Sequence, residues 1–505
     1  MVKIETARKF TFDVGWVFVS LAVSMVVGLL VKIIIGNYYD ASGLGAYSMV
    51  LTIWSMTVIF SELGIPVALI KYVAQYKDKG KIKDTFISTA MISGLILGVI
   101  AMIILFFSSY FLDRIFNIPN LGHLIRILSF CFPFVLINDM FVCSFNGLRM
   151  MKHYSIFEIY RRSAVLVFTV LFIWFGFGVD GAVLALVITP ITVTGIVLAY
   201  HRKIVHFTST GLKKYFRKLL RFGSQLYFSN AVTILNSQAA ILLIGFYLTD
   251  IDVGVYSVVW LFFNVITLVS MAMQRITYPA ITSYFAEKRT NSVKKLMEVS
   301  IRFSFIILSV FSLILFFFID EGIALIFPND PTFLLAVTPL KIILILGLLN
   351  GSVLSVSYVF AAAGRPDIFL KISIIQVTIN LIIALLLIPS SIALFNLEFG
   401  GLNGATIALG ISLLIGFILF IIYLKNSLKI SLKINSILSG FLLFICVIGF
   451  GYILIFEVGL SDNIVGVLVI PIFLALMFII KFIPKDEIQV LINMMKRKNN
   501  KNKHI

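Results

Sequence analysis

The sequence has few charged residues and few cysteines for a chain of 505 residues. Only 13% of its residues are charged and 60% are hydrophobic, whereas a soluble domain is nearer a quarter charged and half apolar. The three cysteines (Cys131, Cys143 and Cys446) lie in apolar runs without metal-ligand spacing, and the five histidines are scattered. This composition excludes a soluble enzyme, a disordered chain and a disulfide scaffold, and we expect no metal site or cofactor. It indicates a polytopic membrane protein.

Apolar runs recur along the whole sequence. Fourteen of them are long enough, or nearly so, to cross a hydrocarbon core of about 30 Å at about 1.5 Å per residue. They occupy residues 12–36, 44–70, 85–110, 121–147, 157–178, 181–200, 224–248, 253–275, 299–319, 335–361, 370–391, 401–424, 435–458 and 462–483. The sequence therefore predicts an all-α membrane protein with about fourteen transmembrane helices.

The basic residues test this count. If the N-terminus lies inside and the loops alternate, all but four of the 41 Lys and Arg residues fall in inner segments or at their flanking helix ends. The four exceptions are Lys32, Arg114, Arg126 and Lys341. Because Lys and Arg in short loops set topology, we predict a multi-pass protein of the cytoplasmic membrane with both termini cytoplasmic. The net charge of +18 then reflects an inner face that favours anionic lipids, which argues against a nucleic-acid partner.

An internal repeat divides the chain. Three local matches recur in order, and they pair Gly43–Ser48 with Asp252–Ser257, Gly147–Arg149 with Gly364–Arg365, and Gly178–Ala185 with Gly401–Ala408. Six helices per copy is an even number, so both copies have the same orientation, as in parallel-repeat transporters. We predict an N-lobe at residues 1–202, an interfacial linker at 203–222, a C-lobe at 223–424, and a C-terminal helix pair with a basic tail at 425–505.

The linker has two different faces when it is drawn as a helix. One face carries Lys213, Lys214, Arg217, Lys218 and Arg221, and the other carries Tyr215, Phe216, Leu219, Leu220 and Phe222. This pattern is typical of a helix that lies on the inner membrane surface. We interpret the segment as a linker and topological anchor.

The order of the motifs resembles a known family. The matching stretches are Gly43–Ser48, Ser61–Pro66, Ala362–Asp367, Asn380–Leu381, Leu387–Pro389 and Gly401–Ala408. They resemble the polysaccharide transporter branch of the multidrug/oligosaccharidyl-lipid/polysaccharide exporter superfamily. The resemblance implies a flippase that moves lipid-linked oligosaccharide or polysaccharide repeat units across the membrane by alternating access, with a polyprenyl-linked oligosaccharide as partner.

Two other classes of function compete with this interpretation. A drug or metabolite cation antiporter of the same superfamily is the alternative, although such antiporters typically have twelve helices. A membrane enzyme would need a sizeable outer domain, and the longest outer loop, at about residues 320–334, is short and has no catalytic cluster. We therefore predict that the protein is not an enzyme.

Ionisable residues inside apolar spans are costly and are default candidates for function. The cations are Lys32, Arg126 and Lys341. We hypothesise that one or more of them lies in the substrate path and pairs with the lipid phosphate. The alternative is that they extend to the outer surface, because all three lie in the outer parts of their helices.

Acids and amides supply the other candidates. Glu62 and Asp139 lie deep in predicted helices, and each either binds a coupling proton in the substrate path or forms a structural ion pair. The resemblance implies a sodium site in the C-lobe, for which Asn236, Asn380 and Thr406 would supply oxygens here. The alternative role of these three residues is interhelical hydrogen bonding. Coupling to a sodium or a proton gradient is therefore an expectation that the sequence leaves open.

Overall fold

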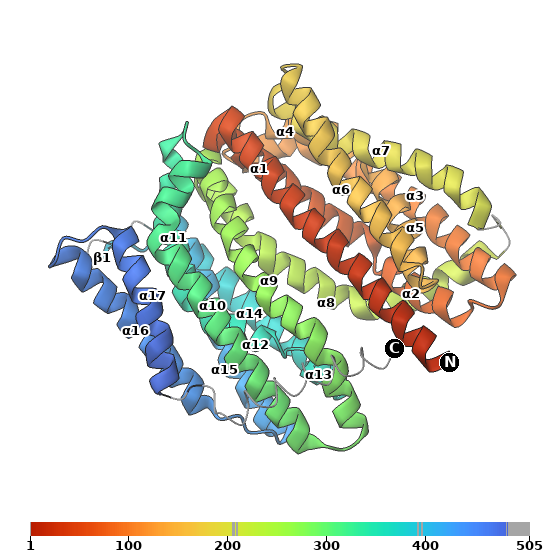
Figure 1. The fold of residues 1–505 in the computed structure, drawn as a ribbon. Helices are drawn as coiled ribbons and strands as arrows, with labels where there is room; N and C mark the ends of the chain where they lie inside the picture. The colour runs from red at the N-terminus through yellow and green to blue at the C-terminus, as the bar shows by residue number, and fades with distance from the viewer. Residues whose placement is uncertain are drawn as a thin grey trace. The chain divides into compact units, whose positions relative to one another are not determined.

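The computed structural model describes residues 2–204, 208, 211–390, 393–394, 397–480 and 482, and it is almost entirely helical (Figure 1). The first eight helices are α1 (Val2–Glu62), α2 (Ile65–Gln75), α3 (Gly80–Ile115), α4 (Leu121–Ser129), α5 (Phe132–Gly147), α6 (Met151–Trp174), α7 (Gly178–Ile204) and α8 (Leu212–Tyr247). The later elements are α9 (Asp250–Ala286), α10 (Thr290–Ile326), the 3-10 helix η1 (Pro331–Ala336), α11 (Val337–Leu346), α12 (Leu348–Leu354), α13 (Val359–Ala362), α14 (Pro366–Leu387), the strands β1 (Ala393–Leu394) and β2 (Leu397–Glu398), α15 (Gly401–Leu428), α16 (Ile434–Phe456) and α17 (Asp462–Ile479).

The helices form two compact units. Unit 1 contains Met1–Ser257 and Phe327–Phe333, and unit 2 contains Val258–Ile326 and Leu334–Ile505. The lobes predicted from the internal repeat do not have the same boundaries as these units. Most of α8 was predicted to belong to the C-lobe, but α8 packs against α1, α2 and α3 in unit 1. The repeat lobes and their boundaries stay a prediction.

The predicted spans coincide with helices or with broken helices. Among the described residues, nine helices are long and apolar enough to cross a membrane, or up to eleven if each of two bent pairs forms one span. The bent pairs are α4 with α5, at 52°, and η1/α11 with α12/α13, at 56°. The remaining predicted spans are also helical, in α6, in α8 and across the α1–α2 break. The fold is therefore an all-α polytopic membrane fold, and the count of fourteen stays a prediction.

One break in the chain separates the first two predicted spans, and a second break interrupts the second span. Inside α1, Tyr39 and Asp40 leave the helical conformation, and Asp40 has a φ of 56°. The second break is at Leu63 and Gly64, both with positive φ, and α2 then begins at Ile65 with Pro66 in its first turn. A side chain at Gly64 would overlap the backbone of Gly223 in α8. A glycine is therefore needed here both for the left-handed backbone and for the close approach of α8.

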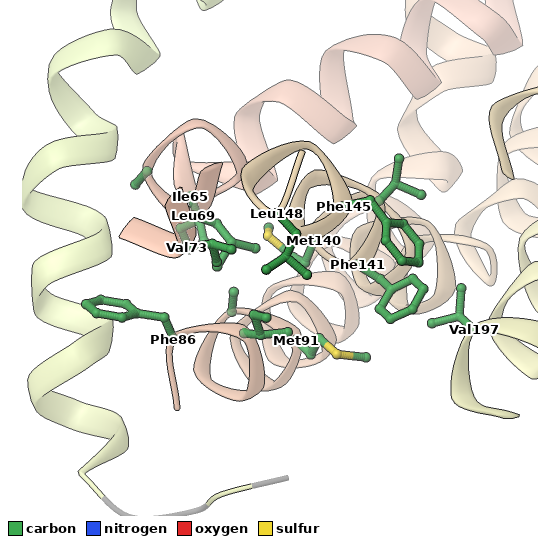
Figure 2. Packing of buried hydrophobic residues seen from close by; sticks show 14 of the residues in the cluster. Ile65, Leu69, Val73, Phe86, Met91, Met140, Phe141, Phe145, Leu148 and Val197 are labelled. Carbon is green, nitrogen blue, oxygen red and sulfur yellow. The ribbon is translucent and has the colours of Figure 1, made fainter. Parts of the chain in front are cut away.

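The core of unit 1 is built from α2, α3 and α5. Its buried side chains include Leu69, Phe86, Met140 and Phe145, which are labelled in Figure 2. Phe141 and Phe145 pack edge to face with ring centroids 4.7 Å apart. These contacts give the polar residues of α5 a rigid support.

The core of unit 2 has a separate set of helix pairs. The helix α15 packs against both α14 and α11, and α17 packs against α10 and α16. Glycines allow close packing here, because a side chain at Gly466 would overlap Phe318 and one at Gly410 would overlap Leu346. The C-terminal pair α16–α17 is therefore joined to unit 2 through α10.

The helix that was predicted to lie on the membrane surface makes contacts with unit 1. Its described part, from Gly211, begins α8, and its apolar side packs onto the core of unit 1. Tyr215 lies edge to face on Phe86, with ring centroids 4.8 Å apart, and Leu219 is fully buried. The apolar side therefore contacts protein, because α2 and α3 offer it an apolar surface that the sequence pattern alone does not reveal.

Candidate functional site

The two copies of the first repeat motif pack against each other within unit 1. A Cβ at Gly45 would overlap the carbonyl oxygen of Asp250, and a Cβ at Gly254 would overlap that of Ala41. The contact is reciprocal, because Ala41 and Gly45 occupy the same positions in the first copy as Asp250 and Gly254 in the second. A reciprocal contact of this kind is what a two-fold relation between copies produces. We call these two segments, Ala41–Gly45 and Asp250–Gly254, the outer crossing, after their predicted side.

Two loops form hydrogen bonds at or near the outer crossing. The backbone N–H of Asn117 donates to the carbonyl of Gly245 at 3.0 Å, at the end of α8. The carboxylate of Asp330 accepts a hydrogen bond from the backbone N–H of Ala41 at 2.8 Å. Ser42 also donates to the carboxylate of Asp250. Hydrogen bonds thus join the Ala41–Ser42 segment of α1 to α9 and to the loop after α10, and they join the end of α8 to the loop after α3.

The charge on Asp330 is favoured by its partners. Burial would raise the pKa of this carboxyl, but hydrogen bonds from Thr332 and from the N–H of Ala41 outweigh it and lower the pKa. Asp330 is therefore held as a carboxylate at the outer crossing.

Lys32 lies on α1 below this crossing. Its ammonium donates to the carbonyl oxygen of Ser257 at 3.3 Å, one turn after Gly254. Among the described residues no carboxylate is within ion-pair distance of Lys32. An ammonium in an apolar span with a single carbonyl as partner has donors left for a further acceptor.

The other two predicted cations have protein partners. Arg126, on α4, places its guanidinium 4.8 Å from the ring centre of Tyr110. Lys341, on α11, contacts the carboxylates of Asp320 at 2.9 Å and Asp462 at 3.9 Å. The geometry of Lys341 is that of an ion pair within unit 2, joining α10, α11 and α17.

The predicted acids belong to a charged cluster on α1, α5 and α6. Arg161 binds Asp139 at 2.6 Å and holds both oxygens of Glu158 at 2.9 and 3.0 Å. Glu62 lies close enough to Asp139 for the two carboxyl groups to interact electrostatically. The alternative of a structural ion pair therefore describes Asp139, and Arg161 is the residue that the sequence analysis missed as a partner. The i,i+3 spacing of Glu158 and Arg161 was the signal that could have found it.

The three candidate ion ligands are found in different parts of the chain. Asn236 is on α8 in unit 1, whereas Asn380 and Thr406 are buried on the packed helices α14 and α15 of unit 2. The hydroxyl of Thr406 donates to the carbonyls of Leu402 and Asn403, both at 2.9 Å. Within the described residues, no group of three or more His, Cys, Asp or Glu residues could hold a metal ion.

Comparisons with known proteins agree with this fold. An uncharacterized membrane protein of Methanocaldococcus jannaschii is 22% identical over 410 residues, which cover 76% of this chain and 79% of that protein. The lipid II flippase MurJ, in an inward closed conformation, superposes with a TM-score of 0.71 at 16% identity, over 91% of this chain and 98% of its own. A multidrug resistance MATE family transporter, in an inward-facing conformation, gives a TM-score of 0.62 at 17% identity, over 80% and 98%.

Two family profiles match the sequence. Residues 226–386 match the MatE profile, and residues 11–285 match the profile described as Polysaccharide biosynthesis protein. The second match covers more than half of the chain, and its residue range includes both segments of the outer crossing. The chain therefore belongs to the polysaccharide biosynthesis protein family, within the multidrug/oligosaccharidyl-lipid/polysaccharide exporter superfamily of membrane transporters.

Proposed function

We propose that this protein is a flippase of the cytoplasmic membrane, with both termini cytoplasmic, that moves lipid-linked oligosaccharide or polysaccharide repeat units by alternating access. The observation that carries the proposal is Lys32, a lysine in an apolar span whose ammonium contacts a carbonyl and no carboxylate. A phosphate-bearing headgroup cannot enter a low-dielectric region unpaired. Lys32 supplies the charge that the phosphate of a polyprenyl-linked oligosaccharide needs.

The outer crossing supplies the gate in this proposal. Backbones that approach through Gly45 and Gly254 leave no space for a sugar between them, so the path is closed on this side while the contact holds. Separation of the two segments would open it. Lys32 donates to Ser257, one turn from Gly254, so a phosphate bound by its remaining donors would lie next to the gate.

Coupling to a proton is the favoured energy source in this proposal. Glu62 and Asp139 lie close enough for their charges to interact, and two neighbouring carboxyl groups away from water favour a state in which one of them carries a proton. The charged or titratable groups that face the pair are Cys143, Tyr154, Glu158, Arg161 and Arg162. Arg161 neutralises part of the negative charge, and the remaining carboxyl exchanges one proton per cycle.

The coupling is tested in proteoliposomes that contain a labelled polyprenyl-linked sugar. Transport by the wild type is expected to increase with an imposed pH gradient, and the Glu62→Gln variant is expected to lose that increase. Transport that instead requires sodium, and ignores the pH gradient, would overturn proton coupling. It would favour coupling to a sodium gradient instead.

The flippase function is tested by deleting the gene and measuring polyprenyl-linked sugars, with their sidedness, in isolated membranes. One glycolipid is expected to accumulate on the cytoplasmic leaflet, and the wild-type gene is expected to reverse this accumulation. The K32A variant is expected not to reverse it. Unchanged glycolipids with a new sensitivity to cationic drugs would contradict the proposal and support a drug or metabolite cation antiporter, a function favoured by the similarity to MATE transporters.

A further inference from the structure

The first three turns of α8 form a rigid platform on unit 1. Tyr215 packs on Phe86, which points from α3 toward α8 in Figure 2. Phe222 packs on Tyr72, with ring centroids 6.1 Å apart, and it also lies 3.5 Å below the ammonium of Lys71. With Leu219 fully buried between these contacts, this part of α8 is held against the protein and cannot rotate its apolar side into lipid.

The opposite side of the same segment is strongly cationic. Its five exposed cations are Lys213, Lys214, Arg217, Lys218 and Arg221. Together with Gly211 and Leu212 they line an open hollow of about 740 Å³. Among the described residues, none of the five forms an ion pair with an acid. The hollow is therefore lined by five positive charges that the protein itself does not neutralise.

This arrangement is unfavourable for the helix alone. Lys213 and Arg217, Lys214 and Lys218, and Arg217 and Arg221 are like charges at i,i+4 spacing, and such pairs destabilise a helix. Lys213 and Lys214 also lie in the first turn of α8, where the helix dipole disfavours cations. An anion bound in the hollow would remove both penalties.

The position along α8 indicates which anion is available. The predicted apolar span of α8 begins at residue 224, about 5 Å along the axis from Arg221 at about 1.5 Å per residue. Long Lys and Arg side chains reach along a helix toward the headgroups when they flank an apolar span. The hollow is therefore at the depth of phospholipid headgroups, on the Lys/Arg-rich side of the membrane.

We propose that this cationic face of α8 is a binding site for the phosphate groups of anionic phospholipids in the adjoining leaflet. The lipid neutralises the face and fixes the position of α8 relative to the membrane. The platform on unit 1 presents the charges in a fixed array, so several phosphates bind with little loss of conformational freedom. This site is independent of the flippase proposal, since it requires no transport.

The test uses the full chain in detergent micelles. Binding of phosphatidylglycerol, with phosphatidylcholine as the neutral comparison, is measured by native mass spectrometry for the wild type and for the triple variant Lys213→Gln, Lys214→Gln, Arg217→Gln. Because each basic residue near a membrane surface contributes appreciably to binding of anionic lipid, the triple variant is expected to lose about tenfold or more in affinity for phosphatidylglycerol.

Controls separate this site from general charge and from free phosphate. The variant Lys288→Gln, Lys294→Gln, Lys295→Gln removes the same charge from another basic segment and is expected to bind phosphatidylglycerol normally. A variant with Lys213→Arg and Lys214→Arg keeps the charge and is expected to bind like the wild type, which controls for folding. Equal losses in both triple variants would overturn the proposal. So would binding of inorganic pyrophosphate to the face without binding of phosphatidylglycerol, because that result would indicate a soluble or substrate phosphate.

Discussion

Lys32 in unit 1 and Lys341 in unit 2 are the same kind of residue in similar predicted positions, but their surroundings differ. Lys341 has Asp320 at 2.9 Å and Asp462 at 3.9 Å, whereas Lys32 has one backbone carbonyl at 3.3 Å. An ion pair offsets much of the free-energy cost of placing a charge in an apolar region, and a hydrogen bond to a single carbonyl offsets less of it. The comparison teaches that the partner of an intramembrane cation distinguishes a structural role from a role in binding a substrate.

Arg161 extends the comparison to a cation with two carboxylate partners, and the largest effect is expected there. The Arg161→Ala variant leaves Asp139 and Glu158 without their cation, so it is expected to lose about 3–5 kcal/mol of stability. Thermal unfolding of the purified protein in detergent measures this loss. Adding Asp139→Asn and Glu158→Gln to Arg161→Ala is expected to restore part of the stability. If these substitutions do not restore stability, the cluster does not stabilise the protein through its charges.

For Lys32 we expect a loss of transport with little loss of stability. A charge-assisted hydrogen bond contributes about 1.5–3 kcal/mol, so the Lys32→Ala variant is expected to transport the labelled glycolipid about 10- to 100-fold more slowly. Lys32→Arg retains the charge and is the matched control, with activity nearer to that of the wild type. Wild-type transport by Lys32→Ala would remove the distinction drawn between the two lysines.

For Lys341 we expect a small loss of stability and little change in transport. Its side chain is 18% exposed and that of Asp320 is 43% exposed, so water weakens the ion pair, and we expect a loss of about 1 kcal/mol in Lys341→Ala. Transport is expected to stay within about threefold of the wild type, about 0.7 kcal/mol in free energy. In the double variant with Asp320→Asn, the stability loss is expected to be smaller than the two single losses together. A strong loss of transport in Lys341→Ala would instead indicate that Lys341 lies in the substrate path.

The smallest effect concerns the pH dependence of the outer crossing. The pKa of Asp330 is lowered in the folded protein, so its stabilising contribution is complete above the unfolded value of about 3.9. The contribution is lost as the pH falls below that value, toward the lower folded pKa. The wild type is therefore expected to lose more stability than Asp330→Asn between pH 5 and pH 3, roughly the window set by these values. Parallel pH curves for the two proteins would contradict this assignment.

Much of the fold was predictable because it depends on local composition. Each predicted apolar run corresponds to a helix or a broken helix, and the motif Gly43–Ser48 with its copy Asp252–Ser257 indicated the repeat that meets at the outer crossing. The partner of Asp139 was not predictable in the same way. Arg161 was interpreted as an inner basic residue, and only the packing of α5 against α6 brings the two side chains within 2.6 Å.

The sequence by itself determined that this protein is an all-α membrane transporter of its family, because hydropathy, charge bias and motif order are properties of the chain read one segment at a time. The tertiary structure alone decided which charges are paired. Lys32 and Lys341 are equivalent cations in apolar spans when the sequence is considered alone. Their roles differ because the cost of burying a charge depends on the groups that folding brings within a few ångströms of it.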